Sequence, residues 1–306
     1  MKTIFHLALG VCLSFSAARA QTSTLHVVEQ NGTRGTRINL VFLSEGYTSA
    51  EMGKFETDVA NTVSFLFTKE PWVRYRSYCN IYRIQIASNQ SGTDSTYTPR
   101  GNAPKVYRDT YFQSGFVTDY IDRLNTISST GAARVYKLLN KHVPEYDIPM
   151  VLVNSNTYGG SGGPIAVATT EASSAAIMEH ELGHSFVRLT DEYDTSTPGY
   201  PATEFPNATA KTRRSDIRWK IWIDQDTPLP TPENNFNFSD KVGLFEGANY
   251  RDKNWYRPHD DALMRSLFRP PGSVTREAFV LKYYSKISPI DSRSDADDQY
   301  QADLIF

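Results

Sequence analysis

The chain has 306 residues, a formal net charge of −2 and 40% hydrophobic residues, with no basic run. This composition predicts a globular protein and argues against nucleic acid as a partner. No internal repeat or low-complexity linker divides residues 21–306, so one continuous domain is expected. Of the 2 cysteines, Cys12 lies in an expected leader and only Cys79 remains, which excludes an intrachain disulfide in the mature protein.

The first twenty residues have the pattern of an export signal. Lys2 supplies a positive charge, residues 4–15 are largely apolar, and residues 18–20 form an Ala-Arg-Ala cleavage site. The apolar stretch is shorter than the about 20 residues that a membrane-spanning helix needs. We therefore expect residues 1–20 to be removed as a signal peptide. The mature protein is expected in the periplasm, at the cell surface or secreted, without a transmembrane anchor.

Apolar runs and alternating patterns predict four strands, at 38–43, 80–86, 148–153 and 165–168. A glycine-rich segment at 158–163 precedes the last of them. It lacks the Lys-Ser/Thr of a phosphate loop and leads into a strand, so nucleotide binding is not expected. We interpret it as a tight turn beside an edge strand that could pair with an extended substrate backbone.

Three helices outside the central motif are predicted. Thr48 and Glu51 form a capping box that opens an amphipathic helix through Leu66. A second helical region covers 120–142, and a last helix runs over 273–283.

The remaining segments read as loops. Residues 88–105 are rich in Gly, Ser, Thr and Pro, which predicts a long surface loop. Prolines recur over 195–232, so that segment should be mostly loop, with a short strand near 219–222. The acidic residues over 291–298 predict a solvated terminus.

The most informative pattern is the HExxH pentapeptide at 180–184. Two histidines four residues apart on a helix lie on one face, so His180 and His184 can bind one ion. Glu181 lies to the side of that face, where it can take a proton from water and pass it to a leaving amine. The small and apolar residues at 171–178 favour a buried helix, in which unpaired ionisable groups are costly. The pattern therefore predicts one catalytic Zn²⁺ and the chemistry of a zinc peptidase, rather than an accidental histidine pair.

A catalytic zinc needs a third protein ligand, and the sequence offers three candidates. Asp191 is preferred, although it would lie about 10 Å beyond His184 if the helix continued. It can reach the ion only if the helix ends near 186–187 and the chain folds back. Glu192 is the second choice and His259 the third. A polar turn without a ligand is the alternative interpretation.

Several blocks of the chain resemble the IgA-specific metalloendopeptidase family of zinc peptidases. They extend from about Ile38 to Tyr284 and include 41–48, 158–160, 180–186, 191–193, 256–258, 264–265 and 276–278. The resemblance implies an α/β (α+β) fold of metzincin-like type: a twisted mixed sheet, an active-site helix and a methionine turn beneath the metal. Met264 stands where that turn would lie. At Val187-Arg188 the chain lacks the family's glycine, which would ease the reversal that Asp191 requires.

We therefore expect a secreted zinc endopeptidase that acts on a protein or peptide substrate. His180, His184 and Asp191 should bind the zinc, with Glu181 as general base and then general acid. The oxyanion donor stays open among four residues: Tyr193, Tyr250, Tyr256 and Arg257. The family name points to immunoglobulin or another extracellular glycoprotein as substrate without fixing it. The alternative is an exported zinc-containing binding protein without catalysis, although such a protein has no need of Glu181.

Overall fold

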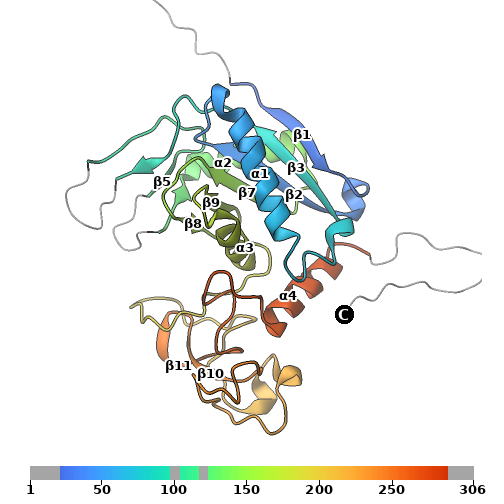
Figure 1. The fold of residues 1–306 in the computed structure, drawn as a ribbon, viewed down its shortest axis with the longest axis vertical. Coiled ribbons are helices and arrows are strands. Elements are labelled where there is room, and N and C mark those ends of the chain that lie inside the picture. The colour runs from blue at the N-terminus through green and yellow to red at the C-terminus, as the bar shows by residue number, and fades with distance from the viewer. Residues whose placement is uncertain (1–20, 97–103, 117–122, 289–306) are drawn as a thin grey trace, which may run out of the picture.

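A six-stranded mixed sheet forms the centre of the computed structural model, which describes residues 21–96, 104–116 and 123–288 (Figure 1). Its strand order is β1 (Thr24–Glu29), β3 (Cys79–Gln85), β2 (Ile38–Glu45), β7 (Ile148–Val153), β9 (Ala166–Thr169) and β8 (Gly160–Ser161). The four inner strands are parallel, whereas β1 and β8 are antiparallel edge strands. β2 and β7 are entirely buried, because their near-continuous apolar runs are covered on both faces.

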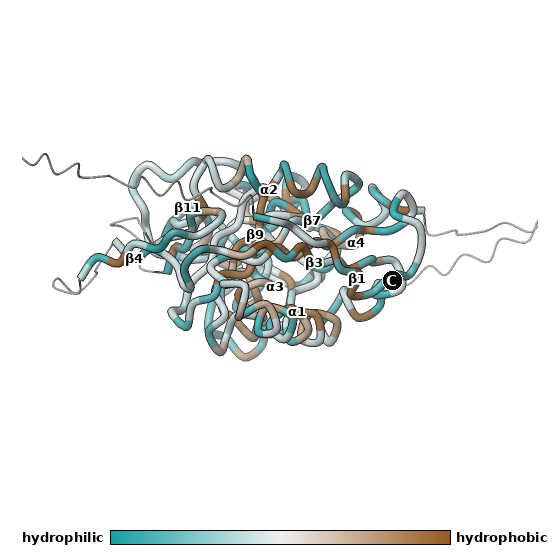
Figure 2. The backbone as a smooth tube through the Cα atoms, turned by 90° about the horizontal axis from the view of Figure 1, so that it is seen from above, coloured by the Kyte–Doolittle hydropathy of each residue, from teal (hydrophilic) through white to brown (hydrophobic). Residues whose placement is uncertain are grey.

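Helices cover both faces of the sheet, which gives this part of the molecule three layers (Figure 2). α1 (Met52–Leu66) and α3 (Ser174–Ser185) pack on one face, and α2 (Ser129–His142) packs on the other. A last helix, α4 (Ser273–Tyr284), packs at the edge of the α1–α3 layer. In this arrangement α3 packs against β9 of the sheet and beside α1.

The two apolar cores follow from the alternation of side chains along the strands. Leu40 and Phe42 of β2 face the core that contains α1, α3 and α4. Val41 and Leu43 face the core beneath α2. Trp72 completes the first core with ring contacts to α4 and to Phe186, directly after α3.

Beyond α3 the chain builds a second, loop-rich part, seen below the sheet in Figure 1. Its only regular pairing among the described residues is the hairpin of β10 (Phe245–Ala248) and β11 (Arg251–Arg257). A small three-stranded sheet of β4 (Asp94–Ser95), β5 (Ser114–Phe116) and β6 (Thr126–Ile127) lies in the first part. Within the described ranges, no helix has the length and apolar character needed to cross a membrane.

Most predicted elements are confirmed. The four strands form at or within one or two residues of their predicted positions. Thr48 and Glu51 make both contacts of the capping box ahead of α1, and the last helix begins at Ser273. Cys79 is a free, buried thiol. The expected leader, 1–20, and the acidic segment 291–298 lie outside the described residues.

The helix predicted over 120–142 is shorter than expected. It begins only at Ser129, because Ser128 Oγ accepts a hydrogen bond from Gly131 N at 2.9 Å and caps the helix. The described residues before this cap pair as β6 instead. The sequence offers other residues of N-cap type before Ser128, such as Asp122 and Asn125, so the start of the helix could not be read from residue type alone.

The strand predicted near 219–222 is wrong. The chain forms a 3₁₀ turn there, η5 (Lys220–Trp222), after a similar turn η4 (Arg214–Asp216). Trp219 is buried and donates from Nε1 to Gly243 O at 2.8 Å, whereas Ile221 is exposed. A single anchored tryptophan, rather than an alternating face, therefore sets the local structure.

Candidate metal centre and cleft

α3 carries both histidines on one face, one turn apart. Their ring centroids are 4.9 Å apart and their Nε2 atoms 3.2 Å apart. His180 Nδ1 lies 3.1 Å from Leu263 O, and His184 Nδ1 lies 2.8 Å from Leu189 O. Because a carbonyl oxygen can only accept, each Nδ1 donates to its carbonyl, and each ring directs its Nε2 to the same point.

The chain reverses directly after α3, as a ligand at Asp191 requires. α3 ends at Ser185, and Arg188 adopts a left-handed conformation with φ 59°. Arg188 N donates to His184 O at 3.1 Å, and Leu189 N donates to Gly183 O at 2.9 Å, which satisfies the last carbonyls of the helix. The reversal is thus made without glycine, at a backbone cost of about 1–2 kcal/mol.

The reversal brings Asp191 back to the two imidazoles. Its Oδ1 lies 3.0 Å from His180 Nε2 and 3.4 Å from His184 Nε2. Its other oxygen, Oδ2, accepts a hydrogen bond from the Tyr250 hydroxyl at 2.5 Å. In the part of the chain that the structure describes, these three residues are the one His/Cys/Asp/Glu group whose ligand atoms all lie within 4.8 Å of one another.

The site formed by His180, His184 and Asp191 favours a bound positive charge. Burial opposes charge on His184, but the Asp191 carboxylate outweighs it and raises the His184 pKa to about 9. Burial also opposes charge on Asp191, yet hydrogen bonds from His180 and His184 hold the pKa of that carboxyl well below its usual range. Either a proton or a divalent cation can supply this positive charge, and the two compete for the same position between the three side chains.

Two buried groups hold the segment that carries Asp191. Asn207 accepts from Thr190 N at 3.0 Å and donates to Thr190 O at 2.8 Å and to the Glu192 carboxylate at 3.0 Å. On the other side, Glu192 N donates to Met264 O at 2.9 Å. Asp191 is therefore fixed through both of its neighbours in sequence.

The turn that contains Met264 lies under the histidine helix. Arg265 N donates to Ala262 O at 2.8 Å to close the turn, and Met264 is fully buried. A Cβ atom added at Gly183 would lie 2.5 Å from Met264 Sδ. The methionine thus packs against the helix at the position between the two histidines.

The other two ligand candidates lie elsewhere. Glu192 is fully buried, accepts a hydrogen bond from Asn207, and has its pKa raised to about 7 by burial. His259 packs beside Gly272, and burial with the nearby Arg276 lowers its pKa to about 4. Neither belongs to the group of converging ligand atoms. Of the three candidates, the structure brings Asp191 to the two histidines.

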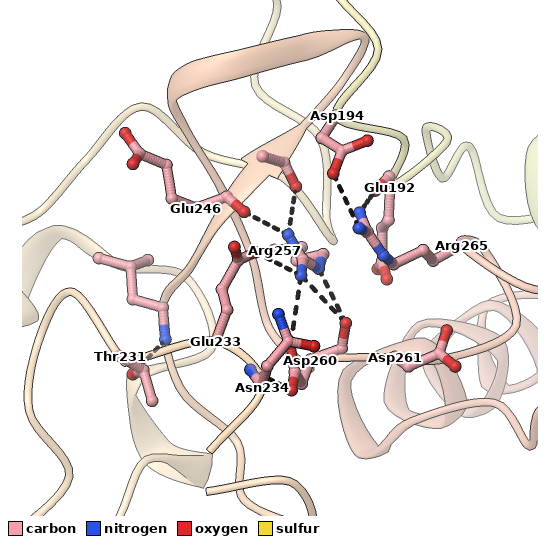
Figure 3. A network of polar contacts seen from close by, with 12 residues as sticks. Glu192, Asp194, Thr231, Glu233, Asn234, Glu246, Arg257, Asp260, Asp261 and Arg265 are labelled. Atoms are coloured by element: carbon pink, nitrogen blue, oxygen red, sulfur yellow. Dashed lines mark hydrogen bonds and ion pairs between the residues drawn. The ribbon is translucent and has the colours of Figure 1, made fainter.

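Two of the four predicted oxyanion donors are directed away from the cleft. Arg257 is 1% exposed, and its guanidinium bonds to Gly247 O at 2.7 Å, to Asp260 O and to the Glu233 carboxylate at 2.6 Å (Figure 3). Tyr256 packs in a separate apolar cluster around Trp219. The Arg257 network stabilises the hairpin and the chain before the Met264 turn.

An open cleft of about 300 Å³ lies over the histidine–aspartate group. Tyr193 and Tyr250, the other two predicted donors, line it, as does Glu181. Arg123 and Tyr200 also line it and were not predicted, because their segments carry no motif and only the tertiary fold brings them here. The remaining lining comes mainly from Leu124, Tyr158, residues 160–162, Ile177 and Leu267.

The edge strand is partly occupied by the chain itself. Gly160 N donates to Arg123 O at 3.0 Å, and Asn125 N donates to Gly160 O at 3.3 Å. The predicted pairing of a substrate backbone with this edge is therefore blocked at Gly160. Gly162 lies directly against His184, with 2.5 Å between an added Cβ and His184 Cβ, so the cleft floor depends on this glycine.

A mixed α/β fold that brings two histidines and an aspartate together in a cleft is typical of metal-dependent hydrolases. The sequence model of the IgA peptidase M64 family matches residues 27–242, most of the chain, and the chain therefore belongs to this family of metallopeptidases. The matched range contains the histidines and Asp191 but ends before Tyr250 and Met264. No curated protein matches the chain.

Proposed function

We propose that the chain is a zinc-dependent endopeptidase. His180, His184 and Asp191 would hold one Zn²⁺, and Glu181 would act as general base and general acid. The observation that carries this proposal is the convergence of two imidazole Nε2 atoms and a carboxylate oxygen on one point. Three such atoms repel one another unless a proton or a metal cation lies among them.

The donor set fits zinc in particular. Bonds of about 2.0–2.1 Å in a tetrahedral site place neighbouring ligand atoms about 3.3–3.4 Å apart. The three separations between the Nε2 atoms and Asp191 Oδ1 are 3.0, 3.2 and 3.4 Å. Each imidazole also has the carbonyl partner on Nδ1 that fixes a metal-binding tautomer. Three protein ligands would leave a fourth position for water or substrate, as a catalytic site requires.

When bound, zinc supplies the positive charge that polarises a substrate carbonyl and makes a water molecule more acidic. Glu181 lies at the cleft, where burial raises its pKa while His180 and His184 act in the opposite direction. A carboxylate with a raised pKa is suited to accept a proton from water and return it to the leaving amine. Tyr250 orients Asp191 through its hydroxyl.

Tyr193 is the better candidate for the oxyanion donor. It lines the cleft, and its ring is parallel to that of His180 within 15°. Among the described residues nothing accepts or donates a hydrogen bond at its hydroxyl, whereas the Tyr250 hydroxyl is engaged by Asp191. We therefore assign the stabilisation of the tetrahedral oxyanion to Tyr193.

The finer features of the fold belong to the same proposal. We take α3 as a metzincin-type active-site helix and the turn at 262–265 as its methionine turn, because Met264 packs against Gly183 between the histidines. We also propose that residues 1–20 are a signal peptide and that residues 21–306 act as one exported domain. The substrate would be a protein, with immunoglobulin or another extracellular glycoprotein suggested by the family name.

The test joins metal analysis to peptide cleavage. The purified protein should contain about one zinc per chain, and a chelator should abolish cleavage until zinc is restored. Glu181→Gln should keep the zinc while cleavage falls by about 10²–10⁴-fold or more. Cleavage that survives this substitution would contradict the role of Glu181. A protein that binds zinc but cleaves no peptide in a broad library would favour the inactive binding protein instead.

A further inference from the structure

Arg123 is an exposed residue that lines the cleft and carries a positive charge. Its guanidinium carbon lies 4.9 Å from the centroid of the Tyr193 ring. Among the described residues no carboxylate forms an ion pair with it.

The backbone around Arg123 fixes the position of this cation. Arg123 O accepts the hydrogen bond from Gly160 N at 3.0 Å, and the neighbouring Leu124 bridges to Gly160 on the edge strand. The stacking contact with Tyr193 holds the side chain over an aromatic face that is itself parallel to His180. The cation thus lies in the same cleft as His180, His184 and Asp191.

With a divalent ion bound at the histidine–aspartate group, the charge of Arg123 would be left without a counter-charge in the cleft. Among the described residues, Glu181 and Asp191 are the carboxylates that line it, and Arg123 is its one arginine or lysine. If the proposed function holds, a divalent ion balances these two carboxylates, and one positive charge remains. The cleft then attracts an anionic group, and the planar fork of a guanidinium binds a carboxylate through two parallel hydrogen bonds.

We propose that Arg123 binds a carboxylate of the substrate and makes the enzyme select acidic peptides. This inference rests on the proposed function for its catalytic consequence. The carboxylate belongs either to an aspartate or glutamate side chain near the scissile bond or to the C-terminus of the peptide. The first source describes an endopeptidase with acidic specificity, and the second describes removal of residues from a chain end.

The experiment compares matched peptides that differ only in this charge. One set carries glutamate or glutamine at each position in turn, with the C-terminus amidated. A second set has neutral side chains and a free or amidated C-terminus. The wild-type protein should prefer the carboxylate in one of the two sets by about ten- to a hundredfold in kcat/KM. Preference in the first set identifies the side chain as the source, and preference in the second identifies the chain end.

Variants of Arg123 test whether this residue carries the preference. In Arg123→Gln the ratio should fall to about one, Arg123→Lys should keep part of it, and Arg123→Glu should favour lysine peptides. Arg213→Gln is the matched control: it removes one positive charge from an arginine that is 81% exposed and outside the cleft. This control should retain the wild-type ratio. Thermal unfolding of each variant shows whether it is folded.

Peptide affinity separates this inference from the proposed function. Calorimetric titration of zinc-loaded Glu181→Gln with the same peptides, with and without Arg123→Gln, reports the preference without turnover. A preference in affinity that depends on Arg123 supports the inference even where no cleavage is found. Equal preferences for the carboxylate peptides in the wild-type and Arg123→Gln proteins would overturn the inference. An equal loss of kcat for all peptides would also overturn it, because that result would mark Arg123 as a transition-state stabiliser.

Discussion

Asn207→Ala tests whether the buried amide beneath the ligand loop determines metal affinity. The Asn207 side chain is fully buried and makes three hydrogen bonds, two to Thr190 and one to Glu192. These are the residues on either side of Asp191. The substitution removes no ligand and creates no charge, so any effect on metal must act through the position of Asp191.

The size of the effect follows from the groups that lose their partner. The variant leaves Thr190 N, Thr190 O and a Glu192 carboxylate oxygen without their Asn207 contacts. Each buried polar group left unpaired costs about 1–3 kcal/mol, so the free energy of unfolding should fall by about 3–5 kcal/mol. Loss of a residue that orients a metal ligand typically weakens metal binding about 10–100-fold. We expect a loss of that size for zinc.

Asn39→Ala is the matched control. Asn39 is also fully buried, and its amide donates to the carbonyls of Arg34, Arg37 and Glu145, but it lies at the start of β2 and contacts no residue of the metal centre. Chelator competition measures zinc affinity, and chemical denaturation measures stability. Both variants should be destabilised, and only Asn207→Ala should bind zinc more weakly. Wild-type zinc affinity in Asn207→Ala, or equal losses in both variants, would refute the reasoning.

Three further predictions follow from single contacts. Gly183→Ala places a methyl group 2.5 Å from Met264 Sδ and should lower the free energy of unfolding by about 1–3 kcal/mol. The loss should be smaller when Met264→Ala is also present, and equal losses with and without Met264→Ala, measured by denaturation, would exclude the clash. Tyr250→Phe removes the 2.5 Å hydrogen bond to Asp191 and should lower the affinity for zinc about tenfold. An unchanged zinc affinity in chelator competition would exclude a role of Tyr250 in orienting Asp191. Burial lowers the pKa of His259 from 6.5 to about 4, so the unfolded chain binds a proton that the folded chain does not, and stability falls as the pH drops through this window. His259→Gln should remove about 2 kcal/mol of the fall between about pH 7 and about pH 4.5, whereas parallel denaturation profiles would contradict it.

The parts of the molecule that could be predicted from the sequence depend on local spacing. The capping box at Thr48 and Glu51 involves residues three apart, and the buried strands β2 and β7 are continuous apolar runs. His180, Glu181 and His184 share one helical turn, so their relative placement follows from helix geometry alone. Asp191 was predicted with one condition, the end of the helix near 186–187, and α3 meets that condition by ending at Ser185.

Residues that the tertiary fold brings to the site could not be predicted. Asn207 follows a proline-rich loop and reads as a surface turn, yet it is fully buried beneath Asp191. Arg123 and Tyr200 reach the cleft from segments without a motif. Arg257 was considered for the cleft because its residue type suits an oxyanion, but the carbonyls around it account for its burial. Residue type alone does not show which way a side chain faces.

Tyr250 shows why local preferences fail next to the metal centre. Asn249 and Tyr250 form the turn between β10 and β11, and both have positive φ, 54° and 56°. Such a turn favours Asn-Gly, and a bulky aromatic residue at the second position costs about 1–2 kcal/mol in backbone conformation. A glycine there would relieve this strain but would leave Asp191 Oδ2 without the hydroxyl that lies 2.5 Å away. The unfavourable turn residue is therefore explained by the carboxylate it orients, and strain of this kind is expected where a binding site outweighs local stability.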